Sequence, residues 1–365
     1  MGRHMMVLGA GLVTADIVQL ANGDWEPVSG RPSYAAGGTV CNVLCHLART
    51  GWHCELIGGV GNDTLGHLVL DDLDHFRVGL RAVRVIDGKP TRRIGQLVSL
   101  DRTKFGLHRF FTRCGACRRE FPPFPVPPPE EVLREVDRLI HQRTVLVIDR
   151  ANELTVALAA QVRAAGGVVV FEPGYLSRTR ASVEGVLAST NILKYSNLLQ
   201  YEGRPFGMSP LASPARVDMV IETRGHRGVA IRRANREIRL TTTPIETGVD
   251  SSGAGDAFMA GFLGGLAEAG LFDLAHLPDR EIEEAAERGQ ALGGLACLYV
   301  GAKGLLNENS SAQLEGLVTE TMQTRRAPQV GVGPRLTSVS RIPIESPSNG
   351  QCPVCRFVLS DRPDG

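Results

Sequence analysis

The sequence lacks an excess of charge of either sign. Among its 365 residues, 40 Lys and Arg stand against 39 Asp and Glu, which gives a formal net charge of +1. This balance argues against a general nucleic-acid partner and against a polybasic membrane anchor. Lysine itself is scarce, so nearly all the cations are arginines; the lysines are Lys89, Lys104, Lys194 and Lys303.

The sequence also lacks long hydrophobic runs and an export signal. No run of about 18 uncharged apolar residues occurs, so we expect no membrane span. The first apolar stretch is short and ends at Asp16, unlike a secretory leader. Eight cysteines are too few for a disulfide-based fold of this length. We therefore expect a cytoplasmic protein.

Glycine is abundant, with 42 residues, and short apolar runs alternate with helix patterns. The strands are expected at 5–9, 54–60, 144–148, 168–171, 191–194 and 217–222, and the helices at 40–50, 129–141, 153–165, 256–269 and 281–299. Continuous apolar strands that alternate with helices indicate a mostly parallel sheet covered on both faces, in an α/β fold.

Two segments depart from this alternation. Residues 17–36 and 82–113 mix polar and β-branched residues and contain the turn pairs Asn22-Gly23 and Asp87-Gly88. We expect them to form a small β element, a lid, on a core made of residues 5–16, 37–81 and 114–310. Residues 325–365 form a Pro-, Gly-, Ser- and Arg-rich linker with a cysteine-containing tail.

The strongest motif is the run DSSGAGDAF at residues 250–258, which leads directly into an apolar helix pattern. Gly253 and Gly255 let backbone N–H groups converge at the helix N-terminus, which suits a phosphate. Asp256 beside such a site needs a purpose, and accepting a proton from an attacking hydroxyl is one. The alternative is a tight turn in which Asp256 only caps the helix.

Two further glycine-rich runs lie earlier in the chain. GGTVCN at residues 37–42 opens the helix expected over 40–50, and Asn42 offers both a donor and an acceptor, which suits a polyol. The alternative is a turn in which Asn42 is a local cap. GGVGNDTLG at residues 58–66 is a glycine-rich segment at the end of an expected strand, and alone it is weak evidence for a ligand site.

In this order and spacing, the three runs resemble the signatures of the ribokinase-like (PfkB) family of sugar and nucleoside kinases. Residues 37–42 match its Gly-Gly-x-x-x-Asn run, and residues 58–66 match its Gly-x-Val-Gly-x-Asp-x-x-Gly turn. Residues 250–258 match its Asp-Thr-x-Gly-Ala-Gly-Asp-x-Phe run, with Ser251 in place of threonine. The resemblance implies a three-layer α/β/α sandwich with a small β-sheet lid, and ATP-dependent transfer of the γ-phosphoryl group to a hydroxyl of a sugar, sugar derivative or nucleoside.

The resemblance also implies residue roles. Asp256 corresponds to the catalytic base, and the anion hole corresponds to Gly253, Ala254 and Gly255. The positions that contact the acceptor are Asp16, Gly38 and Asn42. The positions that meet the nucleotide are Thr223, Gly225, Gly228 and Asn197. Asp250 corresponds to part of the monovalent-cation (K⁺) site of some members.

The cofactors implied are ATP and Mg²⁺, because the phosphate oxygens need charge compensation, and the implied assembly is a homodimer. The sequence departs from the family at Asn197–Gln200, where the usual Asn-x-x-Glu lacks its acid, although Glu202 lies nearby. Thr39 stands where many phosphofructokinase-type members have a basic residue nearby, which favours an acceptor without a phosphate. The identity of the acceptor stays open.

Four cysteines form two Cys-x-x-Cys pairs outside the family pattern: Cys114, Cys117, Cys352 and Cys355. Two such knuckles complete a tetrahedral sulfur site, which suits Zn²⁺. The alternatives are redox-active thiols or two unrelated pairs, and the pairs could meet within one chain or between two.

Two other functions compete with the kinase. Gly9-Ala10-Gly11 after the first strand partly matches a dinucleotide-binding fingerprint, but Thr14 occupies the place of its third glycine. A dinucleotide-dependent oxidoreductase would also leave residues 250–258 unexplained. A zinc-clamped, non-catalytic binding or regulatory protein on the kinase fold fits the missing acid near Asn197, but it does not explain Asp256.

Overall fold

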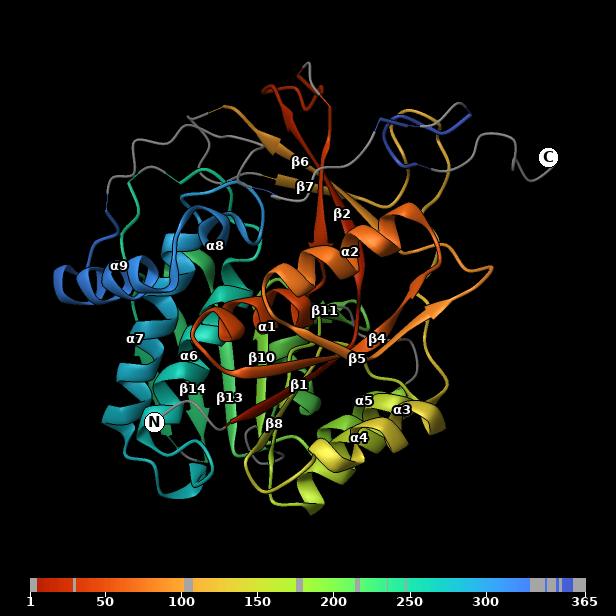
Figure 1. Cartoon of the computed structure of the whole chain (residues 1–365). Coiled ribbons are helices and arrows are strands. Elements are labelled where there is room, and N and C mark those ends of the chain that lie inside the picture. Colours follow the sequence, from red (N-terminus) through yellow and green to blue (C-terminus); the bar gives the residue numbers. More distant parts are fainter. Residues whose placement is uncertain are drawn as a thin grey trace.

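The computed structural model describes residues 5–28, 31–101, 108–174, 180–213, 217–234, 236–246 and 248–328, together with 339, 346–347 and 350–356 of the tail. Most of the linker expected over 325–351, and residues 102–107 of the expected lid, lie outside these ranges. The described residues form a large sheet between helices and a separate small sheet above it (Figure 1).

The large sheet has nine strands in the order β15-β14-β13-β10-β9-β8-β1-β4-β5. The strands are β1 (Met6–Ala10), β4 (His53–Gly61), β5 (Gly79–Ile86), β8 (Thr144–Ile148), β9 (Val168–Phe171), β10 (Ile192–Ser196), β13 (Met219–Thr223), β14 (Val229–Arg233) and β15 (Arg236–Leu240). All neighbours are parallel except β13–β14 and β14–β15. The mostly parallel sheet predicted from the apolar runs is confirmed.

The helices form two layers because successive strand side chains point to opposite faces. In β8, Val145 and Val147 belong to one buried core, and Leu146 and Ile148 belong to the other. The first core includes α1 (Thr39–Arg49), α2 (Thr64–His75), α6 (Ala254–Ala269), α7 (Asp279–Ala296), α8 (Gly304–Glu308) and α9 (Ser311–Thr324). The second includes α3 (Pro129–Val136), α4 (Glu153–Ala164) and α5 (Arg180–Leu187). The predicted three-layer α/β/α arrangement is confirmed (Figure 1).

The small sheet has four strands in the order β3-β2-β6-β7. They are β2 (Thr14–Ala21), β3 (Ser33–Gly37), β6 (Arg93–Ser99) and β7 (His108–Phe111). Because only three residues separate the end of β1 from the start of β2, the small sheet stands at the carboxyl edge of the large sheet. A short hairpin, β11 (Gln200–Tyr201) and β12 (Arg204–Pro205), follows β10.

The structure corrects two boundaries and adds elements. Residues 82–86, expected in the lid, belong to β5, which pairs in parallel with β4. β5 is an edge strand with partly exposed side chains, and this exposure accounts for its mixed polar composition. The helix expected over 129–141 ends at Val136 and continues only as a 3₁₀ turn, Asp137–Leu139. Helices α2, α5, α8 and α9 and the antiparallel strands β14 and β15 were not predicted.

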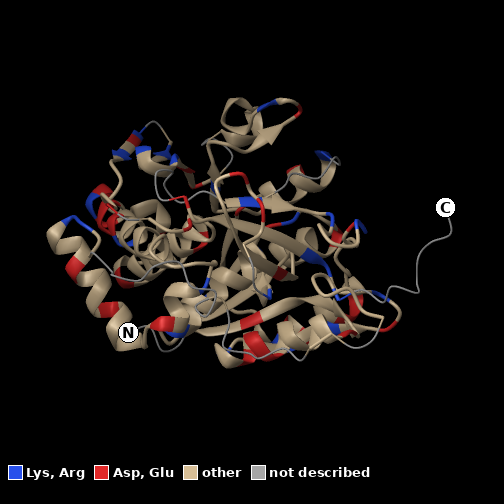
Figure 2. Cartoon of the chain, turned by 90° about the horizontal axis from the view of Figure 1, so that it is seen from above, with Lys and Arg blue, Asp and Glu red and all other residues tan. Residues whose placement is uncertain are grey.

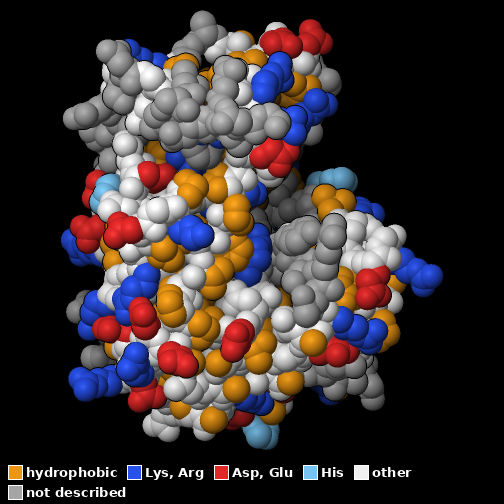
Figure 3. All heavy atoms as spheres, turned by 90° about the vertical axis from the view of Figure 1, so that its right-hand side faces the viewer, with side chains coloured by type: hydrophobic (Ala, Val, Ile, Leu, Met, Phe, Trp, Pro, Cys, Tyr) orange, Lys and Arg blue, Asp and Glu red, His pale blue; other side chains and the backbone are white. Residues whose placement is uncertain are grey.

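The charged residues are dispersed over the molecule. Figure 2 shows Lys and Arg interspersed with Asp and Glu, in keeping with the near-zero net charge. The face in Figure 3 is notched between its upper part and the body below, and hydrophobic and charged side chains alternate over it. Among the described residues, no helix combines the length and the hydropathy needed to cross a membrane.

Candidate active site at the carboxyl edge of the large sheet

A hydrogen bond between two helix N-termini forms the centre of the site. The Asn42 amide Nδ2 in the first turn of α1 donates to Asp256 Oδ2 in the first turn of α6, at 2.7 Å. The first-turn N–H groups of a helix have no intrahelical acceptor, and they favour negative charge. The two predicted glycine-rich runs, more than 200 residues apart in sequence, therefore meet at one carboxylate.

The α6 N-terminus depends on the backbone of Gly253. This residue is the N-cap, with φ 72°, a left-handed conformation that favours glycine. A Cβ here would lie 2.4 Å from the Ala302 Cβ, so the neighbouring loop leaves no space for a side chain. Ala254 and Gly255 then begin the helix and present its first amides beside Asp256.

Asp16, on β2, lies close enough to Asp256 for their charges to interact. Its Oδ1 accepts a hydrogen bond from Thr14 Oγ1 at 2.7 Å. Burial raises the pKa of Asp16 to about 6, although Thr14 and the Lys303 charge lower it and the Asp256 charge adds to the rise. A Cβ on Gly37 would lie 2.1 Å from the Asp16 carboxyl, so the glycine leaves room for this group.

Asp256 is the second carboxyl whose pKa burial raises to about 6. The charge of Lys194 and the hydrogen bonds from Asn42 and Thr39 act in the opposite direction, and the charge of Asp149 raises the pKa further. Since the pKa stays below 7, the carboxylate is mostly ionised at neutral pH. An ionised, hydrogen-bonded carboxylate beside a second acid is able to accept a proton from a hydroxyl.

Asn42 retains one free hydrogen-bonding group. Its Oδ1 is buried and has no hydrogen-bond partner among the described residues, while its Nδ2 is held by Asp256. A buried amide oxygen without a partner is costly, so it favours a ligand hydroxyl that donates to it. Gly38, the N-cap of α1, precedes this first turn. The structure thus brings Asp16, Gly38, Asn42 and Asp256 together as predicted, while their roles stay predictions.

A buried ion pair that the sequence reasoning missed supports Asp256. Lys194, the middle residue of β10, pairs with Glu172, which follows β9, and also donates to the Gly255 carbonyl at 2.9 Å. Burial raises the pKa of Glu172 to about 7, and the Lys194 charge opposes the rise. Glu172 Oε2 is buried and without a partner among the described residues. Scarcity of lysine was the only signal that could have drawn attention to Lys194.

A cavity of about 890 Å³ adjoins the α6 N-terminus. One wall contains Thr223, Gly225 and Gly228, from the turn between β13 and β14, and another contains Ala254 and Gly255. Residues that the motifs did not indicate complete it, among them Thr242, Thr243, Ile245, Gly293, Gly294 and Cys297. The cavity therefore joins the predicted nucleotide turn to the predicted anion hole.

Asn197 lies beside the turn between β13 and β14. The Asn197 backbone N–H donates to the Thr223 carbonyl at 2.9 Å, and its side-chain oxygen accepts from Arg227 at 2.8 Å. Gln200 lines the cavity, whereas Glu202 is exposed in the β11–β12 turn. The structure therefore brings Gln200, and not the acid of Glu202, to the cavity.

The surroundings of Asp250 do not fit a monovalent cation. Oδ2 accepts from Gln96 Nε2 at 2.8 Å, Ser252 Oγ at 2.7 Å and the Gly301 N–H at 2.8 Å. Oδ1 accepts from the Ser252 N–H at 2.9 Å and lies 3.2 Å from His108 Nδ1. Burial favours the neutral acid, but the His108 hydrogen bond and charge and the two amides outweigh it, so the pKa of Asp250 is lowered. Protein donors thus occupy both oxygens.

The structure places an arginine near Thr39 that the sequence did not indicate. The space that a Cβ on Gly174 would occupy lies 3.2 Å from Arg150 NH1 and 3.8 Å from Thr39 Oγ1. Gly174 lines the cavity, and Thr39 bonds to Asp256. The absence of a basic residue at position 39 therefore does not leave this part of the site without a cation.

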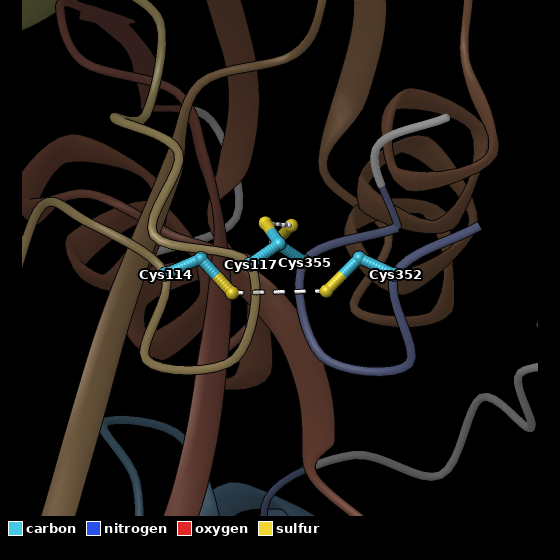
Figure 4. Close-up of side chains that lie close together, drawn as sticks. All are labelled: Cys114, Cys117, Cys352 and Cys355. Carbon is cyan, nitrogen blue, oxygen red and sulfur yellow. Dashed lines mark hydrogen bonds between the residues drawn. The ribbon is translucent and has the colours of Figure 1, made fainter. Parts of the chain in front are cut away.

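The predicted cysteine ligands also come together, away from Asp256 and within a single chain. Figure 4 shows Cys114 and Cys117 on one turn facing Cys352 and Cys355 on another. Their sulfur atoms all lie within 4.8 Å of one another. The Cys355 thiol and the backbone amides of Cys117 and Ala116 bond to the Cys114 sulfur and lower its pKa to about 5, although burial opposes this.

Comparison with known proteins gives one family. The profile of the pfkB family carbohydrate kinases matches residues 5–309 of the chain. A fructokinase of Salmonella typhimurium is 25% identical over 291 residues, which cover 75% of this chain and 89% of that protein. An ATP-dependent ribose-1-phosphate kinase of Halopiger xanaduensis is 27% identical over 305 residues, which cover 81% of this chain and 93% of that protein.

A solved structure shows the same fold. Arabidopsis thaliana ribokinase complexed with ribose and ATP superposes with a TM-score of 0.60 at 19% identity, covering 86% of this chain and 98% of that chain. At this level of identity the likeness establishes the fold alone. It agrees with the three layers and the separate small sheet described above.

The electrostatics of the site predict the effect of removing Lys194. In Lys194→Met we expect the pKa of Asp256 to rise above 6, by about one unit or more, because the favourable cation is lost while burial remains. Titration of the aspartate carboxyl ¹³C signals measures this, with Asp256→Asn to assign the resonance. Lys89→Met, at an exposed lysine, is the control. An unchanged or lower pKa in Lys194→Met would contradict the described electrostatics.

The filled surroundings of Asp250 predict indifference to K⁺. We expect the melting temperature in KCl to match that in tetramethylammonium chloride of equal ionic strength within about 1 °C, because an ion without a site gives no linkage stabilisation. Differential scanning calorimetry measures it, with NaCl as a second control. A rise specific to K⁺ would show that a cation displaces the Gln96 or His108 donor.

Proposed function

The chain belongs to the pfkB family of carbohydrate kinases, and from that premise we propose how its described residues transfer the γ-phosphoryl group of ATP to a hydroxyl of a sugar, sugar derivative or nucleoside. The observation that carries the proposal is the Asn42–Asp256 hydrogen bond beside Asp16, next in sequence to Ala254 and Gly255, which line the 890 Å³ cavity. It supports a site in which an acceptor-binding group, a base and an anion site lie side by side.

Asp16 and Asn42 orient the acceptor in this proposal. Asp16 accepts a hydrogen bond from one hydroxyl, and the partner-free Asn42 Oδ1 accepts from another. Gly38, immediately before the first turn of α1, lets the acceptor approach the backbone. Two acceptor oxygens at fixed positions select a molecule with adjacent hydroxyl groups, which sugars and nucleosides have.

Asp256 takes the proton of the attacking hydroxyl. With a pKa of about 6 it is mostly ionised at pH 7, and burial makes it a stronger base than an exposed aspartate. The hydrogen bond from Asn42 holds Oδ2 of Asp256 beside the acceptor-binding side chains, where the attacking hydroxyl donates to the carboxylate. Activity should therefore fall as the pH drops through about 6, when Asp256 becomes protonated.

ATP occupies the large cavity in this proposal. The first-turn amides of Ala254 and Gly255 face the transferred phosphoryl group, and the turn of Thr223, Gly225 and Gly228 meets the remaining phosphates. Asn197 holds this turn in position, because it bonds to Thr223 and Arg227. The adenine ring of ATP then lies against the end of α7 and the loop that contains Thr242, Thr243 and Ile245.

The residues present fit Mg²⁺ at one carboxylate. Glu172 Oε2 faces the site, buried and without a partner among the described residues, and Mg²⁺ prefers oxygen ligands. Bound Mg²⁺ supplies charge compensation for the phosphate oxygens. Glu172 would hold it directly or through water, with the Gln200 amide oxygen near the phosphates. Lys194 fixes the orientation of Glu172.

The proposal gives the four clustered cysteines no part in the phosphoryl transfer. It includes no K⁺, since protein donors surround Asp250. The homodimer and the cytoplasmic location stay predictions from the family resemblance and the sequence. Fructose and ribose 1-phosphate, named for relatives at 25% and 27% identity, are the first acceptors to examine.

An acceptor screen with Asp256→Asn tests the function. We expect the wild-type chain with ATP and Mg²⁺ to release ADP only when one of the pentoses, hexoses, amino sugars, nucleosides or sugar phosphates is present. In Asp256→Asn we expect turnover to fall about 10²- to 10⁴-fold, because the base is lost, while binding of a fluorescent ATP analogue is retained.

Asp71→Asn, which changes an exposed aspartate of α2, is the matched control and should keep full turnover. Near-normal phosphorylation by Asp256→Asn would refute the assignment of the base. The absence of acceptor-dependent ADP release from the wild-type chain across the whole screen would refute the proposed reaction.

Gly37→Ala tests the acceptor side separately. The added methyl group would lie 2.1 Å from the Asp16 carboxyl, so we expect Asp16 to be displaced and the acceptor KM to rise about 10²-fold. The KM for ATP should change little. Steady-state kinetics measures both, and Gly316→Ala, where a Cβ meets nothing within 4 Å, is the control. An unchanged acceptor KM would mean that Asp16 does not contact the acceptor.

A further inference from the structure

Two Cys-x-x-Cys turns that the kinase chemistry does not use have the same backbone shape. In the first, the Arg118 N–H donates to the Cys114 carbonyl at 3.0 Å, and Arg118 has φ 65°. In the second, the Arg356 N–H donates to the Cys352 carbonyl at 3.0 Å, and Arg356 has φ 61°. Left-handed conformation is uncommon for arginine, so its repetition at equivalent positions indicates that both turns serve one purpose.

The sulfur atoms of the two turns match a tetrahedral metal site. Cys114 Sγ and Cys352 Sγ are 3.8 Å apart, Cys117 Sγ and Cys355 Sγ are 3.4 Å apart, and all four lie within 4.8 Å of one another. Four sulfurs at about 2.3 Å from a central Zn²⁺ are separated by about 3.8 Å. Two disulfides would instead require two pairs at about 2.05 Å with no need for a shared centre.

The charges around the cluster also fit. Four thiolates around Zn²⁺ carry a net charge of −2. Arg93 contacts the backbone of Cys355, Arg356 is the next residue of the tail turn, and the two arginines are only 2% and 7% exposed. Arg93 Nε donates to the Cys355 carbonyl at 2.8 Å, and its NH2 pairs with Asp63 at 3.1 Å. Two buried cations beside the thiolates reduce the cost of burying this charge.

The tail turn is packed on the small sheet next to the acceptor-binding strand. Tyr34 OH donates to the Val354 carbonyl at 2.9 Å, and Arg356 stacks on the Tyr34 ring at 5.3 Å from its centroid. Tyr34 on β3 pairs with Ile17, and Arg93 on β6 pairs with Ala15. The two strand residues that hold the tail turn are therefore the cross-strand partners of both neighbours of Asp16.

We propose that the four cysteines bind one Zn²⁺, and that this ion fastens the tail turn to the small sheet so that β2 holds Asp16 in its acceptor-binding position. The second part rests on the proposed function, and the first does not. The ion joins residues 238 positions apart in sequence. Without it, the described contacts of the tail turn with Tyr34 and Arg93 must overcome the entropy of a long open chain.

Metal analysis of the full chain tests the first part. We expect one zinc per chain, lost in Cys114→Ser and in Cys352→Ser. Cys54→Ala, at a buried cysteine outside the cluster, is the matched control and should keep it. Cys355→His should also keep zinc, because histidine replaces cysteine in such sites. Iron in place of zinc, no metal, or disulfides found by mass spectrometry in the purified chain would overturn the site.

Tyr34→Phe tests the second part in a chain that keeps its zinc. Losing the hydroxyl removes the bonds to Val354 and Arg356. We expect the acceptor KM to rise about 10-fold, with a larger rise in zinc-free Cys352→Ser, because small displacements of a binding group are costly. The ATP dissociation constant should stay unchanged in both variants.

Unchanged acceptor KM values in both variants would overturn the positioning role and leave the zinc site standing. A near-wild-type acceptor KM in Cys355→His would support the positioning role, because that variant keeps the ion without the original side chain. If the wild-type chain phosphorylates no acceptor, the proposed function fails, and the zinc content still decides the first part.

Discussion

The structure depends on keeping a buried carboxylate charged. Asp256 lies where two helix N-termini meet, and its pKa of about 6 reflects burial opposed by Lys194, Asn42 and Thr39. Asn42 and Thr39 come from α1 and Lys194 comes from the middle of β10, whereas Asp256 itself lies in α6. The large sheet and its two helix layers bring these elements to one edge, so the fold can be understood as the support that this charge requires.

Backbone contacts at this edge leave little room for side chains. A Cβ on Gly37 would strike the Asp16 carboxyl, and one on Gly253 would strike Ala302. The same positions that bring helix amides and carboxylates together therefore exclude larger residues. This close approach explains part of the high glycine content, which composition alone could not assign to a location.

The small sheet and the tail turn together hold Asp16 on the acceptor side of the site. The sheet must hold Asp16 in place; Ala15, Ile17, Tyr34 and Ala36 pack into the main core, and the second buried cluster beside the sheet is small. The tail turn adds Tyr34, Arg93 and Arg356 to its support through contacts between distant parts of the chain. A zinc ion on the four cysteines would add metal–thiolate bonds to these buried contacts.

The sequence by itself determined the parts of this protein that depend on local pattern. Apolar runs predicted most of the parallel strands because buried strands are hydrophobic on both faces. Glycine-rich runs predicted which residues meet at the two helix N-termini, and cysteine spacing predicted the four sulfurs. It failed at β5, whose edge position makes it polar, and at the short helix over 129–136. Only the tertiary structure decided that Lys194 and Glu172 pair beside Asp256, that Gln96 and His108 surround Asp250, and that Arg150 approaches Thr39. Those contacts join residues from separate elements, and no local pattern records which distant side chain the packing brings into reach.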